Sequence, residues 1–323
     1  MKIAIWGVGA VGIGLATALA RTKSRIQLLI RSEETAREVG SRGITRTGRF
    51  GEVRIPPEQL EVLRTARELR EDPADWLLVC TKSHSTPAIA SELEDHADRL
   101  TGTTRLLLCQ NGWENETPFL NYWPTDRLFH ARIITGFHKR TATSVEITAH
   151  AASIALGSLY DVAPSLVAPL AERISKGGIP AEASADMRSV LWAKMLYNCA
   201  LNPLGALAGR RYGEITSDPT TKGLLEDVVH EIFEVLAKAE IELAWPDARA
   251  YLETFYSELI PPTAGHESSM LQDLRAGKRT EIDALCGAVE RLGAAHGVAT
   301  PVTSALAVLV RAAESDSEGE NVA

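Results

Sequence analysis

Three polar residues recur every four positions along an apolar stretch in the second half of the chain: Lys194, Asn198 and Asn202. Residues four apart on an α-helix lie on the same side. A lysine ammonium can stabilise charge on an oxygen and donate a proton, and amides can hold carboxylates and hydroxyls. The surrounding sequence, LWAKMLYNCALNPL, is too apolar for a fully exposed helix, so we favour a functional role over a solvated stripe.

A second polar group follows in HESSMLQDLRAGKRTEIDAL. Ser269 is a candidate N-cap for a helix. Glu281 and Asp283 begin the next helical pattern, where the helix dipole alone favours carboxylates. By itself this group does not indicate catalysis.

A glycine-rich motif follows the first apolar run, KIAIW, and opens a helical pattern. It consists of Gly7, Val8, Gly9, Ala10, Val11 and Gly12. The spacing matches GxGxxG, in which the first glycine permits a tight turn, the second allows close approach of a diphosphate, and the third lets helix and strand pack closely. The helix N-terminus offers backbone N–H groups to the phosphates. We therefore predict a dinucleotide site.

The end of the second strand selects between the two nicotinamide cofactors. NAD-binding folds place an acidic residue there to bond the ribose hydroxyls. Here Arg31 and Ser32 end the strand, and a guanidinium suits a 2′-phosphate. This favours NADP(H); the alternative is that Arg31 is a solvated loop residue and Glu33 or Glu34 bonds the ribose.

Polar residues also follow two later apolar runs. Lys82 and His84 follow LLVC, and Asn111 follows LLLCQ. Ligands of open α/β sheets bind outside the carboxyl ends of the strands, so we expect Lys82 and Asn111 to face the cofactor. Asn-Gly is also a common turn, and we interpret His84 as a loop residue.

The positions of these motifs require two kinds of domain. Apolar runs at Lys2–Trp6, Arg25–Ile30, Trp76–Cys80 and Arg105–Cys109 alternate with helical patterns, which indicates a parallel sheet covered on both faces. Residues 128–157 predict consecutive strands, with an antiparallel arrangement left open. From residue 185 the pattern is helical, with Arg249–Leu259, Ser269–Ala276, Glu281–His296 and Val302–Ala313 among the expected helices.

The predicted fold class is thus α/β, a Rossmann-type doubly wound sheet over residues 1–184, followed by an all-helical domain over 185–313. Pro203 should end or kink the helix that carries Lys194. Residues 314–323 are polar and acidic and are expected to be disordered.

The motifs together resemble the ketopantoate reductase (2-dehydropantoate 2-reductase) family. The matching segments are the GxGxxG motif, Arg31, Lys82 in CTKS, QNG at 110–112, WAKMLYNCALNPL at 192–204, SSMLQDLRAGKRTEID at 268–283 and GVATP at 297–301. The resemblance implies a Rossmann domain joined to a helical domain like that of 6-phosphogluconate dehydrogenase, with the active site between them. It also implies NADPH-dependent reduction of 2-dehydropantoate to (R)-pantoate in pantothenate biosynthesis.

The resemblance also implies roles for individual residues. Lys194 is the general acid, and Glu281 positions both this lysine and the nicotinamide ribose. Lys82 and Asn111 touch the cofactor. The substrate is held by Asn111, Asn198, Asn202 and Ser269.

Two positions depart from the family pattern. Tyr212 precedes Gly213-Glu214 where an asparagine is usual, and Trp113-Glu114 is bulkier and more acidic than the usual loop. A different 2-oxo acid is therefore an alternative substrate. A non-catalytic NADP sensor is an alternative of another class, but it needs none of the residues around Lys194.

Composition and charge narrow the partners. The chain has 323 residues and a net charge of −8, half of it from acidic residues beyond Arg311, so it is a poor binder of nucleic acid or anionic membranes. Cys80, Cys109, Cys199 and Cys286 are too scattered for a disulfide framework or a metal site, which indicates a cytoplasmic setting. Amphipathic helices are compatible with a homodimer and equally with a core of their own.

Overall fold

The computed structural model describes residues 1–320, which form two compact units. The first contains Met1–Gln110 and Asn115–Met187, and the second contains Asn111–Glu114 and the chain from Arg188 onward. The division at Met187 lies beside the boundary expected near residue 184. The short segment Asn111–Glu114 belongs with the second unit, although its sequence neighbours belong to the first.

An eight-stranded sheet forms the centre of the first unit, in the order β12-β11-β8-β7-β6-β1-β2-β5. Its strands are β1 (Lys2–Trp6), β2 (Arg25–Leu29), β5 (Leu60–Leu63), β6 (Trp76–Val79), β7 (Arg105–Leu108), β8 (Leu128–Arg132), β11 (Ile154–Gly157) and β12 (Ala181–Ala183). All neighbours are parallel except β8 and β11. The four strands predicted from continuous apolar runs are confirmed, because strands buried on both faces need apolar residues throughout.

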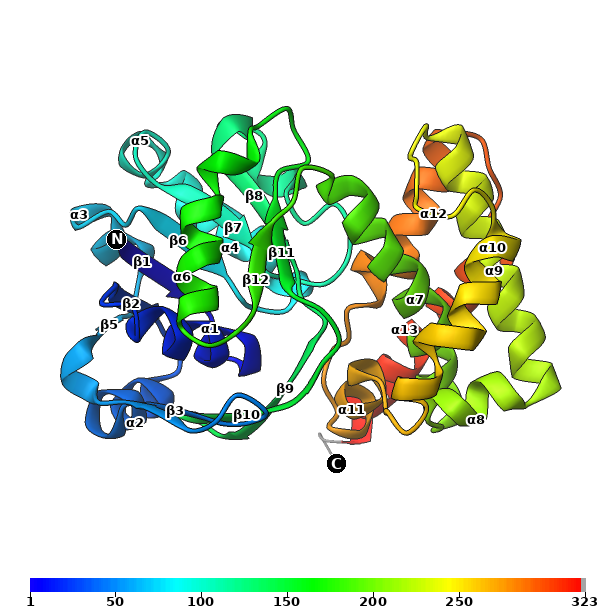
Figure 1. Ribbon diagram of the computed structural model, residues 1–323, viewed down its shortest axis with the longest axis horizontal. Helices are drawn as coiled ribbons and strands as arrows, with labels where there is room; N and C mark the ends of the chain where they lie inside the picture. The colour runs from blue at the N-terminus through cyan, green and yellow to red at the C-terminus, as the bar shows by residue number, and fades with distance from the viewer. Residues whose placement is uncertain (321–323) are drawn as a thin grey trace. The chain divides into compact units, whose positions relative to one another are not determined.

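Helices cover both faces of this sheet (Figure 1). Ile3 and Ile5 of β1 belong to a core with α1 (Ala10–Ala20), α2 (Glu33–Arg42) and α6 (Ala168–Lys176). Ala4 and Trp6 belong to a second core with α3 (Ala66–Glu71), α4 (Thr86–Glu94) and α5 (Ala97–Leu100). Alternate β1 side chains thus enter different cores, as they must in a doubly wound sheet. The predicted fold class is confirmed.

A smaller sheet in the order β4-β3-β10-β9 corrects the expected arrangement of residues 128–157. It contains β3 (Ile44–Gly48), β4 (Val53–Ile55), β9 (Thr135–Thr141) and β10 (Ser144–His150). The expected consecutive strands are divided: β8 and β11 join the large sheet, whereas β9 and β10 pair antiparallel in the small one. β10 also pairs with β3, a polar strand from far earlier in the chain, which local sequence patterns do not predict.

The second unit is helical and has one apolar core. Its helices are α7 (Met187–Ala208), α8 (Tyr212–Ser217), α9 (Pro219–Lys238), α10 (Ala248–Thr254), α11 (Ser269–Arg275), α12 (Cys286–Ala295) and α13 (Pro301–Glu320). A π-helical turn, Phe255–Leu259, continues α10. The expected helix over 281–296 is instead a 3₁₀ turn, Ile282–Ala284, followed by α12, and the two are separated at Leu285.

Two observations concern the expected helix ends. Of the two outcomes expected at Pro203, an end or a kink, the end is excluded: α7 continues past the proline, with Leu201, Leu204 and Ala206 buried on both sides of it. α13 continues from Glu314 to Glu320, where a disordered tail was expected; the Ser315 hydroxyl bonds the Arg311 carbonyl within it. Residues 321–323 of that expected tail lie outside the described residues. Within residues 1–320, no helix is long and apolar enough to cross a membrane.

Candidate functional site

The glycine-rich turn between β1 and α1 has the shape of a diphosphate cradle. Gly7 has φ +101°, and a Cβ on Gly12 would lie 1.9 Å from the Gly7 carbonyl oxygen. A Cβ on Gly9 would meet only the Cys80 carbonyl oxygen, at 3.8 Å, so this side of the turn is open. Because Gly9 has no side chain to cap α1, the first N–H groups of the helix are available to an anion. This turn fits a dinucleotide.

Arg31 lies at the end of β2, as predicted, beside a second guanidinium. Its Nη2 is 2.7 Å from Glu92 Oε2, and its guanidinium lies over the Trp6 ring at 5.6 Å. Arg64, which follows the adjacent strand β5, donates to the Arg31 carbonyl at 2.7 Å. Arg64 was missed from the sequence because β5 was not predicted. Two arginines at adjacent strand ends suit a phosphate.

The residues after Arg31 begin α2. The Ser32 hydroxyl caps the helix by accepting from the Thr35 N–H at 3.3 Å. Glu33 is exposed and pairs with Arg37 on the next turn, at 3.7 Å. Local capping thus accounts for Ser32, and a first-turn ion pair accounts for Glu33.

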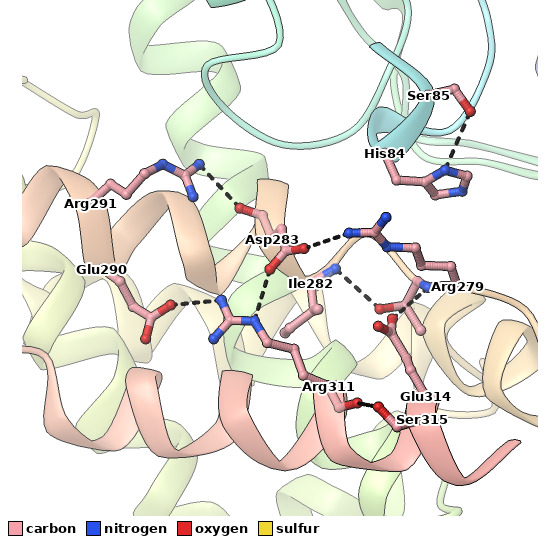
Figure 2. Close-up of polar contacts among 11 residues, drawn as sticks. His84, Ser85, Arg279, Ile282, Asp283, Glu290, Arg291, Arg311, Glu314 and Ser315 are labelled. Atoms are coloured by element: carbon pink, nitrogen blue, oxygen red, sulfur yellow. Dashed lines mark hydrogen bonds and ion pairs between the residues drawn. The ribbon is translucent and has the colours of Figure 1, made fainter. Parts of the chain in front are cut away.

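The ends of β6 and β7 are tied together by Gln110. Its Nε2 donates to Thr86 Oγ1 at 2.7 Å and to the Lys82 carbonyl at 3.2 Å. This fixes the backbone of Lys82, which begins the 3₁₀ turn Ser83–Ser85. His84 is exposed, and its ring contacts the Ser85 hydroxyl at 3.3 Å (Figure 2).

In the second unit, Asn111 joins Lys194 to Glu281. Lys194 Nζ donates to Asn111 Oδ1 at 2.5 Å, and Asn111 Nδ2 donates to Glu281 Oε2 at 2.9 Å. Lys194 is half-buried on α7, and Glu281 is 6% exposed. Three residues far apart in sequence thus form one chain of ammonium, amide and carboxylate.

The backbone of the segment Asn111–Glu114 packs against the Ala284 carbonyl. Gly112 has φ +100°, and a Cβ there would lie 2.4 Å from the Ala284 carbonyl oxygen. Trp113 donates its N–H to the same carbonyl at 2.9 Å. This pairing brings Asn111 to Glu281, which precedes Ala284 by three residues.

The two bulky residues that depart from the family pattern also have partners. The Trp113 ring lies 5.1 Å from that of Trp192 on α7. Glu114 Oε2 accepts from Arg291 Nε at 2.7 Å. Both contacts fasten the segment to the helical unit.

Asp283 is part of an ion-pair cluster that joins α12 and α13 (Figure 2). Its carboxylate pairs with Arg311 at 2.8 Å and with Arg279 at 3.3 Å, while Arg311 also pairs with Glu290 at 3.0 Å. Burial alone would raise the pKa of Asp283, but the hydrogen bonds and charges of the two arginines outweigh burial and lower the pKa. Ion pairs with these arginines thus account for Asp283, whereas the sequence pattern indicated a carboxylate favoured by a helix dipole.

A small hollow lies beside the polar chain Lys194–Asn111–Glu281. It is lined by Asn111, Asn202, Ser269, Met270, Asp273, Glu281 and Leu285. The N-cap of α11 is Ser268, not Ser269: the Ser268 hydroxyl accepts from the Leu271 N–H at 3.0 Å, and Ser269 lines the hollow. Asn198 lies half-buried on α7 outside this set. Asp273 was missed, although it follows Ser269 by four residues and so shares its helix face.

Tyr212 lies behind Asn202. Its hydroxyl donates to Asn202 Oδ1 at 2.8 Å, and the tyrosine is 4% exposed. Burial raises the pKa of Tyr212, so the hydroxyl keeps its proton. The residue that departs from the family pattern therefore contacts a residue that lines the hollow.

Comparisons with known proteins identify the family of this chain. Residues 3–160 match the family model described as "Ketopantoate reductase PanE/ApbA", and residues 186–314 match its C-terminal counterpart. A curated 2-dehydropantoate 2-reductase of Aquifex aeolicus is 33% identical over 317 residues, covering 97% of both chains. The chain belongs to the ketopantoate reductase family.

Solved structures place this family member among oxidoreductases of the same fold. A PanE/ApbA family ketopantoate reductase from Ralstonia eutropha superposes with a TM-score of 0.84, at 26% identity, over 98% of this chain and all of the other. A D-mandelate dehydrogenase solved with NADH and anilino(oxo)acetate gives 0.83, at 25% identity and the same coverage. The second neighbour is thus named as a dehydrogenase of D-mandelate, and its structure holds NADH.

Proposed function

We propose that this protein reduces 2-dehydropantoate to (R)-pantoate with NADPH, the reductive step of pantothenate biosynthesis. The chain Lys194–Asn111–Glu281 beside the hollow carries this proposal, since a cofactor sensor needs no such arrangement. We further propose that residues 1–184 bind the cofactor and residues 185–313 hold the substrate.

The residues of the second unit account for substrate binding and proton transfer. When bound, NADPH supplies the hydride that the substrate carbonyl carbon accepts. The Lys194 ammonium stabilises the charge that develops on the carbonyl oxygen and gives it a proton. Asn111 Oδ1 orients this ammonium, and Glu281 in turn holds the Asn111 amide. Asn202, Ser269 and Asn198 are proposed to hold the substrate.

The residues of the first unit favour NADPH over NADH in this proposal. The turn Gly7–Gly12 takes the diphosphate, and Lys82 is proposed to contact the cofactor. Arg31 and Arg64 would bind the 2′-phosphate, for which Arg31 must exchange its pairing with Glu92.

A second candidate is reduction of a different 2-oxo acid. Tyr212 behind Asn202 and the likeness to D-mandelate dehydrogenase favour it. NADPH oxidation, followed by nicotinamide absorbance over a panel of aliphatic and aromatic 2-oxo acids, separates the candidates. We expect the highest kcat/KM with 2-dehydropantoate. A higher value with an aryl 2-oxo acid would favour the second candidate, and no turnover despite tight NADPH binding would favour a sensor.

A further inference from the structure

We propose that Tyr212 is a positioning residue that fixes the Asn202 amide so that its Nδ2 faces the hollow and donates to the carboxylate of a 2-oxo acid. The inference rests on the proposed reductase function and deepens it. It assigns a role to the residue that replaces the usual asparagine.

The hydrogen bond between Tyr212 and Asn202 has a definite direction. An asparagine amide can present either its oxygen or its nitrogen to a neighbour. Here the Tyr212 hydroxyl donates to Asn202 Oδ1 at 2.8 Å in a buried contact. Because Tyr212 stays protonated, this donor persists at working pH. Rotating the amide would replace Oδ1 with Nδ2 beside the hydroxyl, and the hydrogen bond that the hydroxyl donates to Oδ1 would be lost.

The nitrogen end of the Asn202 amide is available to a ligand in the hollow. Asn202 lines the hollow, but Tyr212 does not. Because Asn202 Oδ1 already accepts from the Tyr212 hydroxyl, Nδ2 is the end of the amide left for a ligand. Asn202 therefore presents a hydrogen-bond donor to the ligand and favours a ligand with an acceptor group there.

The hollow carries acidic side chains in its lining. Glu281 and Asp273 both line it, and carboxylates repel a carboxylate ligand. The Asn111 amide already spans Lys194 and Glu281. Asn202 Nδ2 and the Ser269 hydroxyl are then the lining groups suited to bond a substrate carboxylate, so the direction of the Asn202 amide decides whether such a ligand is held.

The tyrosine itself is held rigidly. Its ring packs edge-on against Tyr197 at 5.7 Å and against His266 at 5.2 Å, and its N–H donates to the His266 carbonyl at 3.1 Å. These contacts hold the Tyr212 hydroxyl in place, as it must be if it is to orient the Asn202 amide.

The test compares Tyr212→Phe with Tyr197→Phe in the full chain. Tyr197 is a matched control: it belongs to the same aromatic group, but its hydroxyl contacts Thr263 Oγ1 at 2.6 Å. We expect Y212F to raise KM for the 2-oxo acid about tenfold, with kcat and NADPH affinity changed less than about twofold. We expect Y197F to leave KM unchanged.

A double-mutant cycle with Asn202→Ala tests whether Tyr212 acts through Asn202. We expect Y212F to add nothing to the KM of N202A. Asn202→Asp is an independent variant, because it keeps an oxygen for Tyr212 but presents a carboxylate oxygen to the ligand. We expect its KM to rise at least as much as that of N202A.

The outcomes separate this inference from the proposed function. Two results would overturn the role of Tyr212 alone while the wild-type protein turns over its substrate. One is that the effects of Y212F and N202A on KM are fully additive, and the other is that Y212F and Y197F have equal KM values. Wild-type KM in N202D would overturn it as well. If the wild-type protein neither reduces nor binds any 2-oxo acid, the proposed function fails and the inference falls with it.

Discussion

The two units of this protein build their parts of the site by different means. In the first, the glycine-rich turn is shaped by backbone: Gly7 at positive φ and Gly12 against the Gly7 carbonyl. In the second, the chain Lys194–Asn111–Glu281 is made of side chains that tertiary structure brings together. A side chain at Gly12 would clash with the backbone of the turn, whereas the arrangement in the second unit depends on which side chain stands at each position.

The largest expected effect on cofactor affinity comes from the backbone-shaped turn of the first unit. Gly12→Ala would place a Cβ 1.9 Å from the Gly7 oxygen, so the turn must open. We expect NADPH affinity, measured by nicotinamide fluorescence, to fall more than about a hundredfold. Gly40→Ala on α2 is the control, since a Cβ there meets nothing within 4 Å, and its affinity should be wild-type. Equal affinities for G12A and the wild type would disprove the cradle.

A smaller effect on cofactor affinity is expected from the Arg31 side chain in the first unit. Arg31→Ala should weaken NADPH about tenfold and NADH less than about twofold, because only NADPH has the 2′-phosphate. Arg54→Ala, an exposed arginine paired with Glu52 at 2.8 Å, is the control. Titration calorimetry with both cofactors measures the difference, and equal losses for the two would contradict the assignment.

The smallest effect separates stability from chemistry in the second unit. Asp283→Asn should lower the free energy of unfolding by about 1 kcal/mol at pH 7 and leave KM unchanged, because solvent screens a carboxylate that is 49% exposed. The native pKa of Asp283 is lowered, so its contribution is present above the unfolded-state pKa and is lost as pH falls through the native value. Urea unfolding at pH 7 and pH 3 measures both. A difference between variant and wild type that grows in acid would be the wrong sign.

The difference between the units also explains what could be predicted from the sequence. Continuous apolar runs reveal β1, β2, β6 and β7, because strands buried on both faces leave no polar positions. The small sheet was missed, because β3 is mostly polar and pairs with the distant β10, and β4 has only three residues. Burial of the flanking residues overrides the tendency of Pro203 to end a helix.

For the site, types and spacing indicate Lys194 and the asparagines, and the family resemblance adds Glu281. Contacts that depend on tertiary structure could not be predicted. The Tyr212–Asn202 bond, Arg64 beside Arg31, and Asn111 between Lys194 and Glu281 each join elements that the sequence leaves unplaced. The choice between Ser268 and Ser269 as N-cap depends on one residue of helix register.

We propose that Lys194 is the proton donor of an NADPH-dependent 2-oxo acid reductase. Its most direct test is turnover of 2-dehydropantoate by Lys194→Ala, alongside NADPH binding by the same variant. We expect kcat to fall by about 10²–10⁴ while NADPH affinity stays within about twofold of wild type. Near-wild-type turnover in this variant would contradict the account.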